Sequence, residues 1–467
     1  MKISLNSILK THACSLFYRF VKFEGAHPIQ IDEVNFSLEE QTGEIDINGT
    51  QWQTEYKTEI IDKSVIDLKV TFKLLKGTCL QSNLGVSLRF KNWSTDNYVL
   101  MPAAVYNGNR FQVKKIEYPP ILTEVQDLGT HKPTIITDIP RLNIEKGPSR
   151  IQQITRDLAT PAVGFRSNET GKGLWMLTTQ ATTLGDSGIE VEENDDRSEA
   201  TITLTAPGVR YDHRYVICSM EHPSEDRGAD FKEGDSIEVK LKLYFFDCPT
   251  IQTLFDYFVN IRKAMTGKVE LKNSIPFYRA WEIQEKKYNE QNWEGELGYY
   301  SVGIREDVHQ DWQVGWVGGM MSTYPMLYGG CEISKERALK TFDFLFKGGQ
   351  DRSGFFHGCG HKGEWFGDNF RDISLKWHLI RKSADALYFL MKQFMLMEKQ
   401  GEIKPKGIWL EGTRLCADAF VKLWEENGQF GQFVDSGTGE IIIGGSVSAG
   451  IAPAGLALAG QYFGTEK

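Results

Sequence analysis

The feature that most constrains the fold is a change in hydrophobic period near Pro249. Before it, segments such as residues 66–74 alternate apolar and polar side chains, which is typical of antiparallel strands with one buried face. After it, apolar residues recur every three or four positions, most clearly in residues 380–394, as in amphipathic helices. The sequence therefore predicts two domains, a β-sandwich over residues 1–248 and an α-helical domain over residues 249–467.

Charge and hydropathy exclude two classes of partner. The chain of 467 residues has 53 Lys and Arg against 62 Asp and Glu, which gives a formal charge of −9. A chain without a basic excess is a poor binder of nucleic acid, because it cannot displace counterions from phosphates. No apolar stretch approaches the roughly 20 residues that cross a bilayer. We therefore expect neither a nucleic-acid partner nor a membrane span.

The N-terminus and the cysteines bear on compartment. Lys10, Thr11 and His12 interrupt the apolar residues at the N-terminus, and no small-residue cleavage site follows, so a secretory signal is not expected. At face value this predicts a cytoplasmic protein, or a periplasmic one if the N-terminus is incomplete. Seven scattered cysteines do not suggest a disulfide scaffold.

Tryptophans and acids accumulate in the helical half. Eight of the eleven tryptophans lie between residues 281 and 424. Flat indole faces suit the C–H faces of sugar rings, and carboxylates suit their hydroxyls. Trp377, Trp409 and Trp424 have helical spacing and are predicted to fill the core, whereas Trp312 and Trp365 accompany carboxylates in loops.

Two loops hold the candidate catalytic groups. Residues 305–319 place Asp311 just before an expected helix, where helix capping and a functional role are both open. Residues 353–368 combine glycines with His357, His361, Glu364 and Asp368. Glu364 is the first choice for proton donor, because an apolar neighbour such as the adjoining tryptophan would raise its pKa.

Metal and cofactor motifs are weak. The spacing His357-x-Cys359-x-His361 matches no familiar closed zinc site and lacks an evident fourth ligand. No phosphate-binding or dinucleotide-binding glycine motif and no nucleophile elbow occurs. We expect no metal and no other cofactor.

A resemblance to a known family rests on five segments. These are DWQVGWVGG (311–319), ERALKTFDFLF (336–346), SGFFHGCGHKGEWFGD (353–368), RKSADALYFLMKQF (381–394) and APAGLALAGQYFG (452–464). The chain resembles the six-hairpin glycosidase superfamily, known from bacterial polysaccharide degradation. The resemblance implies an antiparallel β-super-sandwich followed by an (α/α)6 toroid. A complete toroid has about twelve helices, and only about seven are expected here, so we predict an incomplete toroid, truncated or open.

The resemblance also implies a function. Two carboxyl groups would hydrolyse a glycosidic bond in a polysaccharide or oligosaccharide. Glu364 would be the acid, Asp311 the partner carboxylate and Asp368 the reserve. The substrate-binding residues would be Trp312, Trp365, His357, His361, His309, Arg305 and Arg381. If the sugar is a uronic acid, Arg305 or Arg381 would bind its carboxylate.

Two alternatives stay open. A polysaccharide lyase would remove the C5 proton of a uronic acid, with His309, His357 or Tyr324 as the base. A non-catalytic carbohydrate-binding protein would keep the aromatic surface without a working acid pair. The sequence does not define the sugar, the linkage, the stereochemical outcome or the oligomeric state.

Overall fold

The chain forms two compact units. The computed structural model describes residues 4–61, 64–110, 114–115, 128–131, 135–136, 139–147, 149–215, 221–267, 272, 274–301, 303–316, 319–369, 372–373, 375–445 and 448–464. Unit 1 comprises Met1–Gln112 and Asp138–Leu271, and unit 2 comprises Val113–Thr137 and Lys272–Lys467. Each unit is described by itself below.

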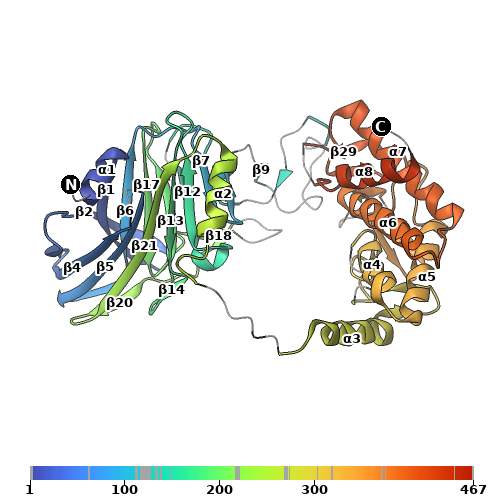
Figure 1. Ribbon diagram of the computed structural model, residues 1–467, viewed down its shortest axis with the longest axis horizontal. Helices are drawn as coiled ribbons and strands as arrows, with labels where there is room; N and C mark the ends of the chain where they lie inside the picture. The colour runs from blue at the N-terminus through green and yellow to red at the C-terminus, as the bar shows by residue number, and fades with distance from the viewer. Residues whose placement is uncertain are drawn as a thin grey trace. The chain divides into compact units, whose positions relative to one another are not determined.

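Unit 1 is a sandwich of two antiparallel sheets (Figure 1). Sheet I has the order β11 (Ser149–Ile154), β16 (Gly188–Glu193), β17 (Glu199–Ala206), β6 (Thr78–Lys91), β1 (Cys14–Glu24) and β2 (His27–Asn35), and β20 (Ala229–Lys232) also pairs with β6. Sheet II has the order β3 (Thr42–Ile47), β4 (Thr50–Ile60), β5 (Val65–Lys76), β21 (Ser236–Asp247), β13 (Lys172–Thr178), β12 (Ala162–Arg166), β7 (Tyr98–Met101) and β8 (Val105–Tyr106). Short pairs β14 (Ala181–Thr182) with β15 (Gly185–Asp186) and β18 (His213–Tyr215) with β19 (Glu221–Pro223) lie outside the sheets, and helix α1 (Leu5–Thr11) precedes β1. The β-sandwich predicted from the sequence is therefore present.

The alternating residues build the core between the sheets. In β5, Ile66, Leu68 and Phe72 are buried, and the intervening side chains are more exposed. Leu84 and Val86 of β6 join the same cluster. Each such side chain contributes roughly 1.5–3 kcal/mol on burial, which explains why the period-two pattern specifies the sheets.

Helix α2 (Ile251–Ile261) belongs to the sandwich. Its N-cap, Thr250, accepts a hydrogen bond from the backbone of Thr253. Trp175 of β13 stacks on Phe258 with ring centroids 4.6 Å apart, and its Nε1 donates to the carbonyl of Leu254 at 3.0 Å. Figure 1 shows α2 lying along the strands of sheet II. Because this helix packs on the sheet, unit 1 extends to residue 271, beyond the boundary at residue 248 that we expected from the sequence.

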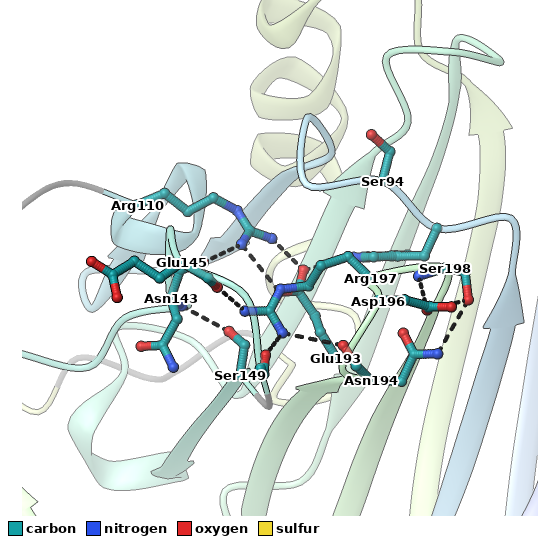
Figure 2. A network of polar contacts seen from close by, with 12 residues as sticks. Ser94, Arg110, Asn143, Glu145, Ser149, Glu193, Asn194, Asp196, Arg197 and Ser198 are labelled. Atoms are coloured by element: carbon teal, nitrogen blue, oxygen red, sulfur yellow. Dashed lines mark hydrogen bonds and ion pairs between the residues drawn. The ribbon is translucent and has the colours of Figure 1, made fainter.

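A buried ionic network at the edge of sheet I holds residues 141–147 against the sandwich (Figure 2). Glu193 forms ion pairs with Arg110 and Arg197, and it accepts a hydrogen bond from Trp93 Nε1 at 2.7 Å. Arg197 Nη2 also donates to the carbonyl of Glu145 at 2.7 Å. The fully buried carboxylate therefore has partners on both oxygens.

The described part of unit 2 is helical with three small antiparallel sheets and one short parallel strand pair. Its helices are α3 (Phe277–Lys287), α4 (Met320–Gly329), α5 (Glu332–Gly348), α6 (Ile380–Gln400), α7 (Gly407–Asn427) and α8 (Ala452–Phe463), with a π-helical turn at Tyr288–Asn292. The small sheets are β22 (Trp293–Glu294) with β23 (Tyr299–Tyr300), β24 (Trp312–Gln313) with β25 (Cys359–His361) and β26 (Glu364–Phe366), and β27 (Trp377–Leu379) with β28 (Phe433–Asp435) and β29 (Ile441–Ile443). Residues 114–115 (β9) and 135–136 (β10) form a parallel pair.

Helix α6 is the centre of unit 2. The predicted stripe of Ala384, Leu387, Met391 and Phe394 is fully buried, and α6 packs against α4, α7 and α8. Trp409 is a core residue as predicted, whereas Trp424 is exposed. The described part of this unit has six helices and shows no closed ring, so the toroid stays a prediction.

Candidate functional site

The small sheet β24–β25–β26 has an aromatic face and a polar face. Trp312, Gly360 and Trp365 are paired across its strands, so their side-chain positions share one face. His361 and Glu364 are also paired, and the alternation along each strand places them on the opposite face. The sequence suggested that tryptophans and carboxylates of this loop would act together. In the structure they lie on opposite faces of the small sheet.

On the aromatic face, Trp312 is a core residue. It is 0% exposed, and its ring meets those of Trp365 and Phe344 edge-on, each at 5.3 Å. A side chain without exposed surface cannot stack on a sugar. The predicted substrate-binding role of Trp312 is therefore replaced by a packing role.

Trp365 borders a groove of about 580 Å³. Gly363 and Phe344 also line it, and its charged residues are Glu296, Lys340, Asp343 and Lys347. An aromatic surface with both donors and acceptors around it suits a ring that presents C–H groups and hydroxyls. The loop that the sequence singled out does lie at a concavity.

On the polar face, Asp311 orients His361. Asp311 is 2% exposed, and its Oδ2 accepts a hydrogen bond from the Tyr299 hydroxyl at 2.8 Å and lies 3.1 Å from His361 Nδ1. Burial, together with the Asp311 carboxylate, raises the pKa of Tyr299, so the phenol stays a donor. When His361 Nδ1 carries the proton shared with Asp311, its Nε2 is left as a proton acceptor.

Glu364 is exposed at the end of the β25–β26 hairpin. The apolar enclosure by Trp365 that we expected is absent, because adjoining residues of a strand point to opposite faces. Its cross-strand partner is His361, so Glu364 lies beside the residue that Asp311 holds. The structure thus brings Asp311, His361 and Glu364 into one row.

Asp368 forms a buried ion pair. Lys382 Nζ lies 2.6 Å from its Oδ1, and the backbone N–H of Leu379 donates to Oδ2 at 2.8 Å. His378 Nδ1 is 3.4 Å away. Burial alone would raise the pKa of Asp368, but Lys382 and His378 outweigh it and hold the pKa well below its ordinary value. A carboxylate this firmly ionised and covered is unsuited to the reserve catalytic role predicted for it.

Asp385 is a candidate that the sequence did not reveal. It lies near the start of α6, is 6% exposed, accepts a hydrogen bond from Trp316 Nε1 at 2.9 Å, and has Arg381 Nε at 3.5 Å. Burial raises its pKa by more than Trp316 and Arg381 lower it. Such a carboxyl group holds a proton at higher pH than an ordinary aspartate, as a general acid must.

Residues 311–316 connect the surroundings of His361 with those of Asp385. Asp311 at one end contacts His361, and Trp316 at the other end contacts Asp385. Gly315 has φ +75°, and a Cβ there would lie 2.1 Å from the carbonyl oxygen of Lys382, so only glycine allows this approach to α6. The segment therefore joins the polar face of the small sheet to the start of α6.

Three other residues predicted to bind substrate, His309, His357 and Arg305, have different surroundings. Burial and the positive charge of Lys382 lower the pKa of His309. His357 lies 3.8 Å from Asp351 and stacks against Trp365 at 6.5 Å. Arg305 instead donates to the carbonyls of Gln291 and Trp293 and is tied to that turn.

In the described ranges, no three His, Cys, Asp or Glu side chains converge as ligands of a metal ion would. Within the same ranges, no helix combines the length and the apolar character needed to span a membrane.

Comparisons with known proteins give only distant likenesses. No protein-family model matches the sequence, and no curated protein sequence matches it. Among solved structures, a putative aldose 1-epimerase from Escherichia coli K12 is similar at 11% identity and a TM-score of 0.25, over 53% of this chain and 88% of that one. Cellobiose 2-epimerase from Bacillus thermoamylovorans is similar at 13% identity and a TM-score of 0.26, over 39% of this chain and 49% of that one. A TPR-domain containing protein from Parabacteroides distasonis has 11% identity and a TM-score of 0.26, over 88% of this chain and 56% of that one.

Likenesses at these scores establish neither a fold nor an activity. The matches also span about half of the cellobiose 2-epimerase and of the TPR-domain protein. Membership of the six-hairpin superfamily therefore stays a prediction.

Proposed function

We propose that unit 2 binds a carbohydrate and acts on it by acid–base chemistry, with hydrolysis of a glycosidic bond as the reaction. The observation that carries the proposal is the pair of groups joined by residues 311–316: an aspartate-oriented histidine at one end and a proton-holding aspartate at the other. Hydrolysis needs one group that donates a proton and one that accepts a proton.

In this proposal Asp385 protonates the oxygen of the leaving sugar, and His361 removes a proton from the attacking water. Asp311 keeps the ring of His361 in position and stabilises its charged form, as a carboxylate does for a catalytic histidine. Glu364 is the second choice for the acid, because it is exposed beside His361. Trp365 and the groove beside it supply the surface for the neighbouring sugar units.

One observation favours a second reaction at the same groups. The side chain of Arg381 is exposed, and its guanidinium lies 5.5 Å from the centre of the Trp316 ring, beside Asp385. An exposed guanidinium pairs well with a carboxylate, so a uronic acid would place its charge there. His361 would then remove the C5 proton, and the protein would be a lyase.

Product analysis tests the proposal. Purified protein is incubated with neutral polysaccharides (cellulose, xylan, starch) and with uronic-acid polysaccharides (pectate, alginate). Hydrolysis releases reducing ends without new ultraviolet absorbance. A lyase releases unsaturated ends that absorb in the ultraviolet, which would replace the hydrolytic reaction by the second one.

The variants Asp385→Asn and His361→Gln decide whether unit 2 carries the chemistry. Both are expected to slow product release by about 10²–10⁴ while the protein stays folded. Lys404→Gln, on the loop between α6 and α7, is the matched surface control. Glycan binding without any product would contradict the proposal and leave a binding protein.

A further inference from the structure

Trp316 lies where residues 311–316 meet helix α6. Its side chain is partly buried and packs against a small apolar cluster that contains Leu379, Phe433 and Ile443. These three residues belong to β27, β28 and β29, which form one of the small sheets of unit 2. The sheet therefore gives the indole ring a fixed packing surface.

Two cations of α6 lie over the ring of Trp316. The guanidinium of Arg381 is 5.5 Å from the ring centre, and the Nζ of Lys382 is 5.1 Å from it. A cation within about 6 Å of an indole face is attracted to it. Lys382 is fixed in turn, because its Nζ lies 2.6 Å from Asp368 and donates to the carbonyl of Gly358 at 3.2 Å. Rotation of the indole would lose the contacts with both cations, so they hold its N–H in one direction.

The indole N–H points to one oxygen of Asp385. Trp316 Nε1 donates to Oδ2 at 2.9 Å, and Arg381 Nε lies 3.5 Å from the same oxygen. Among the described residues, none forms a hydrogen bond with Oδ1. In a protonated carboxyl group the carbonyl oxygen accepts hydrogen bonds and the other oxygen carries the proton. The proton of Asp385 therefore belongs on Oδ1.

The described elements packed against α6 place no second charge beside Asp385. α4 and α8 contain tyrosines but no Asp, Glu, Lys, Arg or His, and the charged residues of α7 are exposed. The other charged groups near the start of α6 contact one another, Lys382 and His378 with Asp368, and His361 with Asp311. Within the described chain, Arg381 is therefore the charge that acts on Asp385.

We propose that Trp316 is the positioning residue of the proton donor: its N–H holds Oδ2 of Asp385, so that Oδ1 carries the proton that is transferred. This inference rests on the acid role proposed for Asp385. In the transfer, the O–H bond at Oδ1 breaks and the proton binds the oxygen of the leaving sugar. The negative charge left on the carboxylate is shared with Oδ2, where Trp316 donates and Arg381 lies close. Trp316 thus stabilises the state that follows proton transfer.

The variant Trp316→Phe tests the proposal, because it keeps an aromatic ring under the two cations and removes the N–H. The carboxylate of Asp385 then loses a donor, so its pKa should rise further. The alkaline limb of the pH profile of kcat/KM is expected to move up by about one pH unit, and the plateau to fall about tenfold. Trp424→Phe, at an exposed tryptophan of α7, is the matched control and should change neither. A lower plateau with an unmoved alkaline limb would reduce Trp316 to a packing residue and overturn the proposal.

A second measurement needs neither substrate nor variant. In the natural protein, the indole N–H resonance of Trp316 is expected to shift with pH at the same midpoint as the carboxyl carbon of Asp385. An indole resonance that does not follow this titration would overturn the inference, even if Trp316→Phe failed to fold. Absence of any cleaved polysaccharide would instead contradict the proposed hydrolysis, so the two failures are distinguishable.

Discussion

Two buried carboxylates, one in each unit, differ in how completely they are compensated. Glu193 of the sandwich contacts Arg110 and Arg197, as Figure 2 shows, and it also accepts a hydrogen bond from Trp93. Asp385 of the helical unit has one hydrogen bond from Trp316 and a longer contact with Arg381. The first arrangement fixes a carboxylate and the loop beside it, whereas in the second arrangement burial raises the pKa of Asp385 above the ordinary aspartate value. Charge compensation by neighbouring arginines, more than burial, therefore distinguishes the anchoring carboxylate Glu193 from Asp385, which we propose as the proton donor.

The largest expected effect is on activity. Asp385→Asn removes the proposed proton donor but can keep the hydrogen bond from Trp316, so turnover of the polysaccharide that is cleaved should fall by about 10²–10⁴ while the fold is kept. Rates of reducing-end release measure the loss. Glu364→Gln in the same assay is expected to lose less than about tenfold, and the reverse ranking would return the role of acid to Glu364.

The second largest expected effect is on stability and concerns the buried ion pair of Lys382 and Asp368 in unit 2. Lys382→Met leaves Asp368 buried without its cation and should cost about 3–5 kcal/mol in the free energy of unfolding. Urea unfolding measures this loss. The double variant with Asp368→Asn should regain part of it, since no charge is then left unpaired. A loss below about 1 kcal/mol in the single variant would show that the pair is not a structural anchor.

Glu193→Gln tests the sandwich side of the comparison. The change leaves Arg110 and Arg197 with a neutral partner, and we expect a loss of about 2–3 kcal/mol in the stability of unit 1. Hydrogen exchange should become faster in residues 141–147, and activity should be kept. Glu199→Gln on the neighbouring strand is the control. Unchanged exchange would mean that the network does not hold this loop.

The smallest effect is a pH dependence. Because the pKa of Asp385 is higher in the folded than in the unfolded state, the folded protein binds more protons between the two values. Lowering the pH through this window, towards the ordinary aspartate pKa of about 3.9, should therefore stabilise the natural protein relative to Asp385→Asn. Thermal unfolding of the two proteins as a function of pH measures the difference. A difference that is independent of pH would contradict the raised pKa.

The sequence predicted the secondary structure correctly where the apolar side chains of a segment recur with a single period and are buried together on one face. Residues 66–74 lie in β5, and the apolar stripe of residues 380–394 is the buried face of α6. The affiliation of α2 was not predictable, because its partner Trp175 is distant in the sequence. Whether the helices close into a toroid is likewise not predictable from a local sequence pattern, because closure depends on contacts between distant segments.

The site was predictable only in part. The proximity of Asp311 and His361 follows from two loops that the sequence marked as polar. Adjacent residues, however, misled the assignment of Glu364, because strand alternation places Trp365 on the other face. Asp385 was missed because its contact with Trp316 joins residues 69 positions apart. An acid four residues after Arg381 at a helix start was the available signal.

Titration of the aspartate side chains by carbon-13 NMR tests the central claim most directly. The carboxyl carbon of each aspartate reports its own protonation, so Asp385 and Asp368 can be followed in the same sample. The account predicts that Asp385 titrates above the ordinary aspartate value and Asp368 below it. An Asp385 that is already ionised below that value would contradict the account, since no proton would then be held for a leaving sugar.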